Sequence, residues 1–559
     1  MGATGREAAW PRGGPLLLFA ALAALSLGVY RPALHGPFVS DDFGYIVASP
    51  YTSSLGAEQL VEILDPRGQA RLFTANYAPV HLLLTALERQ IFADEVLGYH
   101  LGNVLVHALC GTLLAALLRQ SGVSMPGALL GAGFFTLHPA NVEAVAWISQ
   151  LKTCASLALA LGALLAFRRR PGLATALFAL ALLTKASAAA ALPAAAAACW
   201  VRVGGPGAPA GERRRCLGWL AAWTLLFGAF AVAELSAHTA TGDFEVAAFA
   251  DRGVKLRTIA AVGARYLVMA ATSFGVSAFQ EPPPALSAFD PWWLAALPLA
   301  ALLAWRCAIA LRQRREEAAF WVLAAASFAP VSQIAPFVNP VADRYLYFLL
   351  PGLIGGALLA GGDLLARRAS PAARRRAARL GVAAAALALA FFGARSTERA
   401  ALWQSEMRLL LDAARHYPQG GTAAFLRARR AAQEGDTATA VAELRAAEAG
   451  HAARFTVLLE DPGLRPLRGA PAFEALLAEM AGRWIERSRA RGVESQPELR
   501  VRALAHQVRG EWELAAATLE RALRVGGPQD ELVRGQLARV REELAARRGA
   551  GSTGAGAGD

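Results

Sequence analysis

"PLLLFAALAALSLGVYRPALHGPFVSDDFGYIVASP", residues 15–50, joins an apolar run to an acidic loop. The run is close to the roughly 20 residues that cross a bilayer as one helix. Only Arg6 and Arg12 precede it, it lacks a convincing small-residue cleavage site, and further apolar runs come after it. We therefore interpret it as an uncleaved membrane anchor rather than a signal peptide. Asp41 and Asp42 follow just outside this first span.

The composition of the 559-residue chain agrees with this interpretation. Hydrophobic residues make up 55% of the chain, charged residues make up 18%, and the mean hydropathy is +0.35. Because an average soluble domain has about 25% charged residues, these values exclude a disordered chain and argue against one that is water-soluble throughout. The net charge is +13, but the arginines cluster in short breaks between apolar runs, as cytoplasmic anchors do in membrane proteins. We expect no nucleic-acid partner.

The cysteines and lysines indicate more about the class of protein and its compartment. The five cysteines lie in or beside apolar runs and form no CxxC pair, so we expect neither a structural disulfide nor a cysteine zinc site. Only Lys152, Lys185 and Lys255 are lysines among the 56 basic residues. This arginine bias favours a GC-rich genome, which points to a bacterial inner membrane, and makes each lysine a selected residue.

Apolar runs that approach the length of a membrane span recur up to about residue 395. We place eleven, at 14–33, 98–118, 126–147, 152–167, 172–184, 186–202, 216–235, 291–311, 318–338, 345–365 and 377–394. The 172–202 stretch predicts either one kinked helix or two short ones, because it contains Lys185 and Pro193. Residues 258–278 are apolar too, but as a span they would break the charge pattern, so we expect a re-entrant or interfacial helix there.

The arginine clusters predict the orientation. The strongest are Arg168–Arg170, Arg213–Arg215, Arg312–Arg315 and Arg367–Arg376. With eleven spans and a cytoplasmic N-terminus (1–13), all four clusters lie inside. The loops 34–97, 148–151, 236–290 and 339–344 and everything after 395 then lie outside. The membrane domain therefore covers 14–394, with large outer loops at 34–97 and 236–290.

The C-terminal part predicts a different structure. Residues 422–449 and 499–527 each indicate two amphipathic helices, turning at Gly435 and Gly510. This plan resembles the tetratricopeptide unit of about 34 residues, so we expect a degenerate α-solenoid over 395–548 and a disordered tail over 549–559. The fold class is thus all-α: a polytopic helical membrane domain followed by a tetratricopeptide-like solenoid.

Two polar motifs stand out in the membrane half. Asp41 and Asp42 are adjacent carboxylates, and such a pair can raise one pKa, share a cation or supply a general base; the alternative is a helix N-cap pair in a solvated loop. In residues 134–153, His138 precedes a proline and Glu143 follows near bilayer depth. Polar groups there mark a site by default, and the alternative is a structural pair at a helix kink.

Other polar residues lie at the same predicted face. His100, Asn103 and His107 share one side of the second span, and for His107 we prefer a helix–helix hydrogen bond to a metal-ligand role, since no strong metal spacing occurs. The face collects nine candidate site residues: Asp41, Asp42, His100, His138, Glu143, Lys152, Lys185, Arg265 and Arg344. Cations here can hold a phosphate while a carboxylate deprotonates a hydroxyl; the alternative for each cation is snorkelling to the interface.

Several segments, in order, resemble one family: "SDDFGYI", "NYAPV", "GYHLGNVLVHAL", "LHPANVEAVAWISQLK", "LLTK" and "ADRYLYF". They are similar to the transmembrane-and-tetratricopeptide-repeat (TMTC) proteins and their bacterial relatives. These belong with the protein O-mannosyltransferases in the GT-C class of integral-membrane glycosyltransferases. The resemblance implies a polyprenyl- or dolichyl-phosphate-linked sugar donor and transfer to an acceptor hydroxyl outside the membrane. It also implies the eleven-span arrangement.

The resemblance assigns roles by position. Asp41 or Asp42 would be the catalytic base, and His138 and Glu143 would line the same cavity. Lys152, Lys185 and Arg344 would bind the lipid phosphate. We also group His100 and Arg265 with the substrate-binding residues. Two departures concern the basic positions: the residue after Lys185 is alanine rather than the family's usual glutamate, and "ISQLK" replaces a small-Gly-Arg-Lys run.

The expected function is transfer of mannose or a similar hexose from a polyprenyl-phosphate donor to a hydroxyl of a protein Ser/Thr or an envelope glycan. Membrane lipid and a protein bound by the repeats are further expected partners. No cofactor is required, and whether a divalent cation bridges the acid pair and the phosphate stays open. Two alternatives remain: a non-catalytic membrane-anchored repeat scaffold, and a transporter of a lipid-linked precursor. The transporter would place polar residues at mid-bilayer in paired broken helices.

Overall fold

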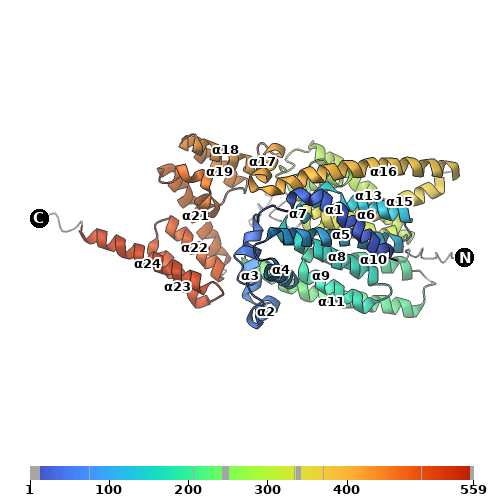
Figure 1. The fold of residues 1–559 in the computed structure, drawn as a ribbon, viewed down its shortest axis with the longest axis horizontal. Helices are drawn as coiled ribbons and strands as arrows, with labels where there is room; N and C mark the ends of the chain where they lie inside the picture. Colours follow the sequence, from blue (N-terminus) through green and yellow to red (C-terminus); the bar gives the residue numbers. More distant parts are fainter. Residues whose placement is uncertain are drawn as a thin grey trace. The chain divides into compact units, whose positions relative to one another are not determined.

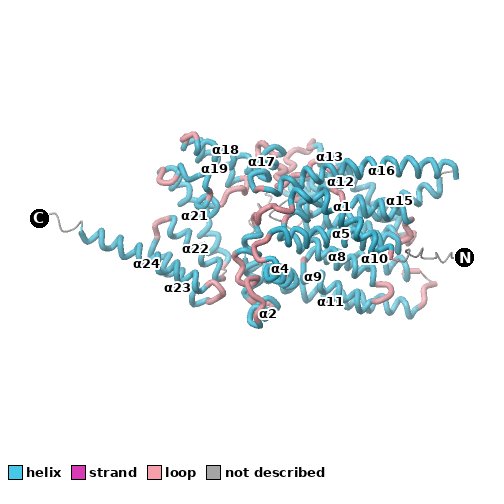
Figure 2. The backbone as a smooth tube through the Cα atoms, viewed as in Figure 1, coloured by secondary structure: helices cyan, strands magenta, loops and turns pink. Residues whose placement is uncertain are grey.

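The computed structural model describes residues 13–74, 76–205, 207–241, 251–332, 334, 341–368, 371–492 and 494–553. Within these ranges the regular structure is helical and no strand occurs, as Figure 2 shows. The all-α expectation is therefore confirmed. The predicted cytoplasmic N-terminus lies, apart from residue 13, outside the described residues.

The described residues divide into two compact units. The membrane unit comprises 1–52, 78–232 and 246–412, and the C-terminal unit comprises 53–77, 233–245 and 413–559. The boundary predicted at 395 falls inside a long helix that belongs to the membrane unit. The loop predicted over 34–97 is shared, because its middle part groups with the C-terminal unit.

The helices up to residue 400 carry the labels of Figure 1. They are α1 (Gly14–Tyr30), α2 (Ala57–Leu64), α3 (Gln69–Thr74), α4 (Pro79–Phe92), α5 (Val96–Gln120), α6 (Met125–Thr136), α7 (Val142–Ala146), α8 (Leu151–Ala166), α9 (Pro171–Thr184), α10 (Ala191–Val203), α11 (Ala210–Thr241), α12 (Arg252–Thr272), α13 (Pro291–Arg312), α14 (Glu317–Phe328), α15 (Leu346–Arg368) and α16 (Pro371–Ala400). Short 3-10 or π turns join several of them, notably η2 (Phe43–Val47), η3 (Pro139–Asn141), η4 (Ile148–Gln150), η5 (Ala186–Ala190) and η7 (Asp343–Tyr345).

The apolar helices match the predicted spans one by one. Eight described helices are long and apolar enough to cross a membrane, and three apolar helices are shorter: Met125–Thr136, Pro171–Thr184 and Glu317–Val331. Each overlaps one of the eleven predicted runs; at the predicted run 318–338 the helical segment ends at Val331, and 333 and 335–338 lie outside the described residues. Helix α12 is not among them, in agreement with the expectation that 258–278 is no ordinary span. The chain is thus a multi-pass membrane protein.

Two predicted spans differ in detail from the structure. The predicted span 126–147 is broken: α6 ends at Thr136, and Asn141 Nδ2 donates a 2.7 Å hydrogen bond to the Phe135 carbonyl where the helix can no longer continue. Pro139 disfavours helix at the residue before it, which explains the break. The 172–202 stretch forms two helices, and the chain breaks at Lys185, whose backbone is extended, rather than at Pro193.

Helix α5 lies at the centre of the packing in the membrane unit. It contacts α1, α6 and α8, and α8 packs on α9 (Figure 1). Helix α14 packs on α15 and α10. The contacts between α5 and its neighbours include polar ones. His107 lies within hydrogen-bond distance of the Tyr347 hydroxyl (2.8 Å) and the Thr136 carbonyl (3.0 Å), so the helix–helix role preferred for this histidine is confirmed.

The C-terminal unit is also helical. Its helices are α17 (Glu406–His416, which begins in the membrane unit), α18 (Gly421–Gln433), α19 (Thr437–Ala449), α20 (Phe455–Glu460), α21 (Pro471–Arg491), α22 (Gln496–Val508), α23 (Trp512–Val525) and α24 (Asp530–Thr553). The predicted helix pairs appear as α18–α19 and α22–α23, and Gly435 and Gly510 turn them with φ of 80° and 73°. Helix α24 extends through residues 549–553, so that part of the predicted disordered tail is helical; 554–559 lie outside the described residues.

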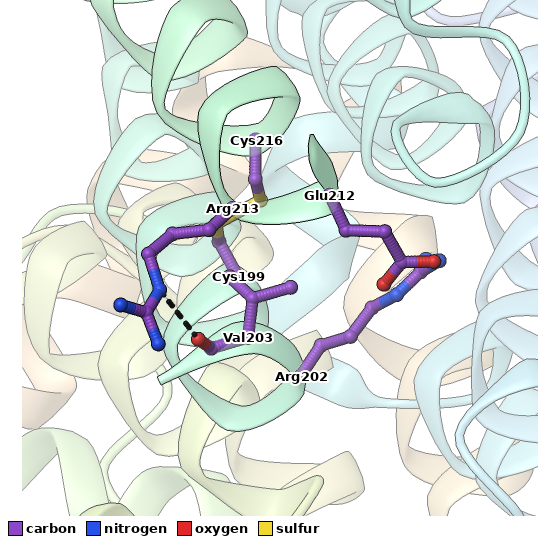
Figure 3. Close-up of a disulfide and its surroundings, with 6 residues drawn as sticks. All are labelled: Cys199, Arg202, Val203, Glu212, Arg213 and Cys216. Atoms are coloured by element: carbon purple, nitrogen blue, oxygen red, sulfur yellow. Dashed lines mark hydrogen bonds and ion pairs between the residues drawn. A yellow bond between two sulfur atoms is a disulfide. The ribbon is translucent and has the colours of Figure 1, made fainter. Parts of the chain in front are cut away.

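The cysteine expectation is wrong for one pair. Cys199 of α10 and Cys216 of α11 form a disulfide, shown in Figure 3, with their Cα atoms 6.3 Å apart. The chain between α10 and α11 brings together two cysteines that are 17 positions apart, a proximity that their separate apolar contexts do not reveal. Cys110, Cys154 and Cys307 are free thiols.

Candidate functional site

The two aspartates of the acidic loop have different environments. Asp42 is fully buried, and its carboxylate accepts hydrogen bonds from the backbone N–H groups of Val39 (2.9 Å) and Ser149 (2.8 Å). Asp41, the preceding residue, is exposed. Ser40 directly before it has φ of 51°, a strained value for a non-glycine residue. Asp42 therefore fixes the loop, and Asp41 is the carboxylate that is open to solvent.

Burial also changes the proton affinity of Asp42. Removal from water disfavours its charged form and raises its pKa from the ordinary 3.8 to about 6. The two backbone hydrogen bonds oppose that shift. The result is a carboxylate that is anchored by hydrogen bonds and titrates in a mildly acidic range.

The irregular segment after α6, residues 137–150, packs against the acidic loop. Asn103 Nδ2 on α5 contacts the carbonyls of Val145, Trp147 and Ile148 at 3.0–3.2 Å, and so holds the irregular chain that leads to Ser149. The Trp147 indole N–H donates to the Val39 carbonyl at 3.3 Å. These contacts tie the segment to the acidic loop.

Glu143 is occupied by Arg344. Its carboxylate accepts a 2.8 Å hydrogen bond from the backbone N–H of Arg344 and forms an ion pair with the Arg344 guanidinium. The guanidinium also lies over the rings of Trp147 (5.4 Å) and Tyr345 (5.1 Å) and interacts electrostatically with Asp41. Glu143 is only 5% exposed, and its carboxylate holds both the backbone and the side chain of Arg344. Glu143 therefore orients Arg344 toward the acidic loop.

The two lysines lie at the start of α8 and the end of α9. Lys185 Nζ donates to Thr153 Oγ1 at 2.7 Å, and Thr153 donates in turn to Gln150 Oε1 at 2.6 Å. Lys152 Nζ lies 4.3 Å from the centre of the Tyr45 ring. In the part of the chain that the structure describes, neither ammonium group has a carboxylate within ion-pair distance. We call Lys152, Lys185 and Arg344 the basic cluster.

Three predicted site residues make their contacts outside the basic cluster. His100 Nε2 is 3.2 Å from the Gly36 carbonyl, so this side chain secures the start of the acidic loop. Both ring nitrogens of His138 contact backbone, with Nδ1 accepting from the Ala140 N–H (3.2 Å) and Nε2 near the Ala270 carbonyl (3.1 Å). Arg265 lies over the Trp292 ring at 4.5 Å. These contacts give His138 a structural role at the kink, and its place in a catalytic cavity stays a prediction.

Sequence reasoning missed two residues beside the basic cluster. Tyr45 follows the acid pair, and His81 on α4 contacts the Tyr45 ring with ring centres 5.0 Å apart. The sequence signal that could have identified Tyr45 is its position three residues after Asp42. His81 directly follows the "NYAPV" segment, but a single histidine in an amphipathic helix gives no pattern of its own. The described residues contain no group of three or more His, Cys, Asp or Glu side chains that could hold a metal ion, and the question of a divalent cation stays open.

Two known proteins are similar to parts of this chain. No family model matches the chain. The protein O-mannosyl-transferase Tmtc1 of Drosophila melanogaster is 31% identical over 155 residues, which is 27% of this chain and 18% of that relative. A crystal structure of the Archaeoglobus fulgidus oligosaccharyltransferase in the apo form is similar over 70% of this chain and 56% of that one, with a TM-score of 0.39 and 13% identity. The match to Tmtc1 confirms the resemblance to the TMTC proteins over that part of the sequence.

Proposed function

We propose that this chain is an integral-membrane glycosyltransferase that moves a hexose from a polyprenyl-phosphate donor to an acceptor hydroxyl. The resemblance supports the reaction class, since Tmtc1 is named a protein O-mannosyl-transferase. The donor, the acceptor and the residue roles are inferences from the site. The acceptor that we favour is a protein Ser/Thr, because stacked helix pairs like those of the C-terminal unit can present a surface for peptides.

The observation that carries the proposal is the pair of lysines without carboxylate partners. Both Lys152 and Lys185 are partly buried, and a cation removed from water is costly unless an anion compensates it. No side chain among the described residues supplies that anion at ion-pair distance. A phosphate held by the lysines, with Arg344 beside them, would compensate the charge and place a leaving group near Asp41.

The reaction that fits this arrangement is a single displacement with inversion. Asp41 takes the proton of the acceptor hydroxyl, whose oxygen forms a bond to C1 of the sugar. The bond between C1 and the phosphate oxygen breaks, and its electron pair stays on the polyprenyl phosphate. The basic cluster stabilises the added negative charge of that leaving phosphate. Asp42 positions Asp41 through its backbone contacts and takes no proton from the acceptor.

The experiment measures sugar transfer from a panel of polyprenyl-phosphate sugars by purified protein, with and without a metal chelator. We expect Asp41→Asn to lower kcat by at least 100-fold, because the amide cannot accept the proton. Lys152→Gln should weaken donor use by about 10-fold or more, since removing an interaction with a charged ligand costs about 1.5–3 kcal/mol. Lys255→Gln is the matched control, because Lys255 is a partly buried lysine outside the basic cluster whose Nζ donates to the Ile334 carbonyl at 2.9 Å.

The outcomes separate the alternatives. Transfer that survives Asp41→Asn in a folded protein would overturn the assignment of the base while leaving the class intact. A wild-type protein that binds the lipid but transfers no sugar under any metal condition would favour the scaffold. Movement of the lipid-linked sugar across a vesicle membrane without transfer would favour the transporter.

A further inference from the structure

His81 is a buried imidazole that has no hydrogen-bond partner in the described part of the protein. Its side chain is 0% exposed, and neither Nδ1 nor Nε2 has a hydrogen-bond partner. A buried polar group without a partner destabilises the folded state, so most such groups are satisfied by another group or by water. An imidazole with both nitrogens unsatisfied at a sugar-transfer site therefore points to a ligand.

The surroundings of His81 indicate where that ligand would lie. Helix α4 packs against α5, α9 and η2, and η2 carries Tyr45. The ring of Tyr45 contacts His81 at 5.0 Å and the Lys152 ammonium at 4.3 Å, so it lies next to both. Lys185 also acts electrostatically on His81. The histidine thus lies beside the tyrosine ring that Lys152 contacts and within electrostatic range of both lysines that lack carboxylate partners.

Charge determines the form in which His81 acts. Burial and the two nearby ammonium groups lower the pKa of His81 well below its ordinary value, so the ring is neutral at physiological pH. A neutral imidazole has one N–H donor and one acceptor nitrogen. It can therefore donate one hydrogen bond to an anion beside the lysines without adding a third positive charge.

We infer that His81 donates a hydrogen bond to the phosphate of the lipid-linked sugar donor. This inference rests on the proposed function and adds a neutral contact to a phosphate otherwise held by cations. Negative charge accumulates on the phosphate as the bond to C1 breaks, so the hydrogen bond strengthens in the transition state. A donor of this kind affects kcat more than KM.

The test measures kcat and KM for the wild type, His81→Leu and His81→Gln. The concentration of the sugar donor is varied at a fixed acceptor concentration. His81→Leu should lower kcat about 100-fold with a change in KM below 3-fold, because the N–H donor is lost. His81→Gln should recover at least a tenth of the wild-type kcat, since its amide supplies an N–H. Lys255→Gln again serves as the unaffected control.

A binding measurement keeps the inference separate from the activity. Polyprenyl phosphate, the product lipid, is titrated onto each variant, and its affinity is measured. If the wild type transfers sugar and His81→Leu matches it in kcat and in lipid affinity, the inference fails and the proposed function stands. If the wild type binds the lipid without transferring sugar, weaker binding by His81→Leu supports the phosphate contact and unchanged binding overturns it. A wild type that neither transfers nor binds overturns both, and a loss of thermal stability with unchanged kcat per folded molecule assigns His81 a structural role.

Discussion

Asp41 and Asp42 show how adjacent identical residues acquire different chemistry. The chemistry of a carboxylate depends on its access to water and on the donors that surround it. The Asp42 carboxylate accepts hydrogen bonds from the N–H groups of Val39 and of Ser149, which is 107 positions from Asp42, whereas Asp41 remains exposed. The sequence predicted a functional pair here but could not choose between its members. That choice depends on Ser149, whose distance in sequence hides its contact with the loop.

The raised pKa of Asp42 predicts a pH dependence of stability. Its pKa is about 6 in the folded protein and 3.8 without burial, so the folded state binds the proton more tightly between these values. The free energy of unfolding should therefore fall as pH rises from about 4 to about 6. Asp42→Asn should flatten this dependence, and unfolding midpoints in detergent between pH 4 and 7 measure it. Asp41→Asn, which removes an exposed carboxylate, should keep the wild-type slope; equal slopes for wild type and Asp42→Asn would contradict the assignment.

At the scale of elements, hydropathy located the apolar segments but not the breaks within them. The run 126–147 has the composition of one span, yet the chain leaves the helix after Thr136. Pro139 disfavours helix there, but the path of the chain after the break depends on partners set by tertiary packing: the amides of Asn141 and Asn103 donate to backbone carbonyls on either side of it. The same limit applies to the site. The basic cluster was predicted from charges in a polar-poor region, while His81 was missed because only packing places it beside Tyr45.

The disulfide between α10 and α11 predicts a measurable contribution to stability. Closing a loop of about 15 residues stabilises a fold by about 3 kcal/mol in the chain-entropy account, and these cysteines are 17 apart. Cys216→Ala should lower the free energy of unfolding by about 2–4 kcal/mol, and a reductant should lower it in the wild type but not in the variant. Cys307→Ala, which removes a free thiol, is the control. Titration of five free thiols in the unreduced wild type, rather than three, would contradict the pairing.

At the scale of the whole molecule, the candidate site and the C-terminal helix pairs fall in different units. Asp41, His81 and the basic cluster all belong to the membrane unit, while the helix pairs belong to the other unit. The sequence predicted this division from a change in composition, although the helix α16 carries the membrane unit past the predicted boundary. The predicted orientation rests on arginines alone. Arg213–Arg215 lie next to Cys216, so a loop predicted to be cytoplasmic also carries a disulfide, a bond that is rare in that compartment.

A topology measurement resolves this conflict between arginines and disulfide. A reporter enzyme that becomes active only after export is inserted in the 204–209 loop in one fusion and placed after residue 553 in another. The arginine clusters predict an inactive reporter in the loop and an active one at the C-terminal site, because eleven spans put these two positions on opposite sides. The cysteines would then lie in a reducing compartment, where their disulfide is expected to be transient. An active reporter in the loop with an inactive one after residue 553 would reverse the orientation, place Asp41 and the basic cluster in the cytoplasm, and exclude a donor and an acceptor located outside.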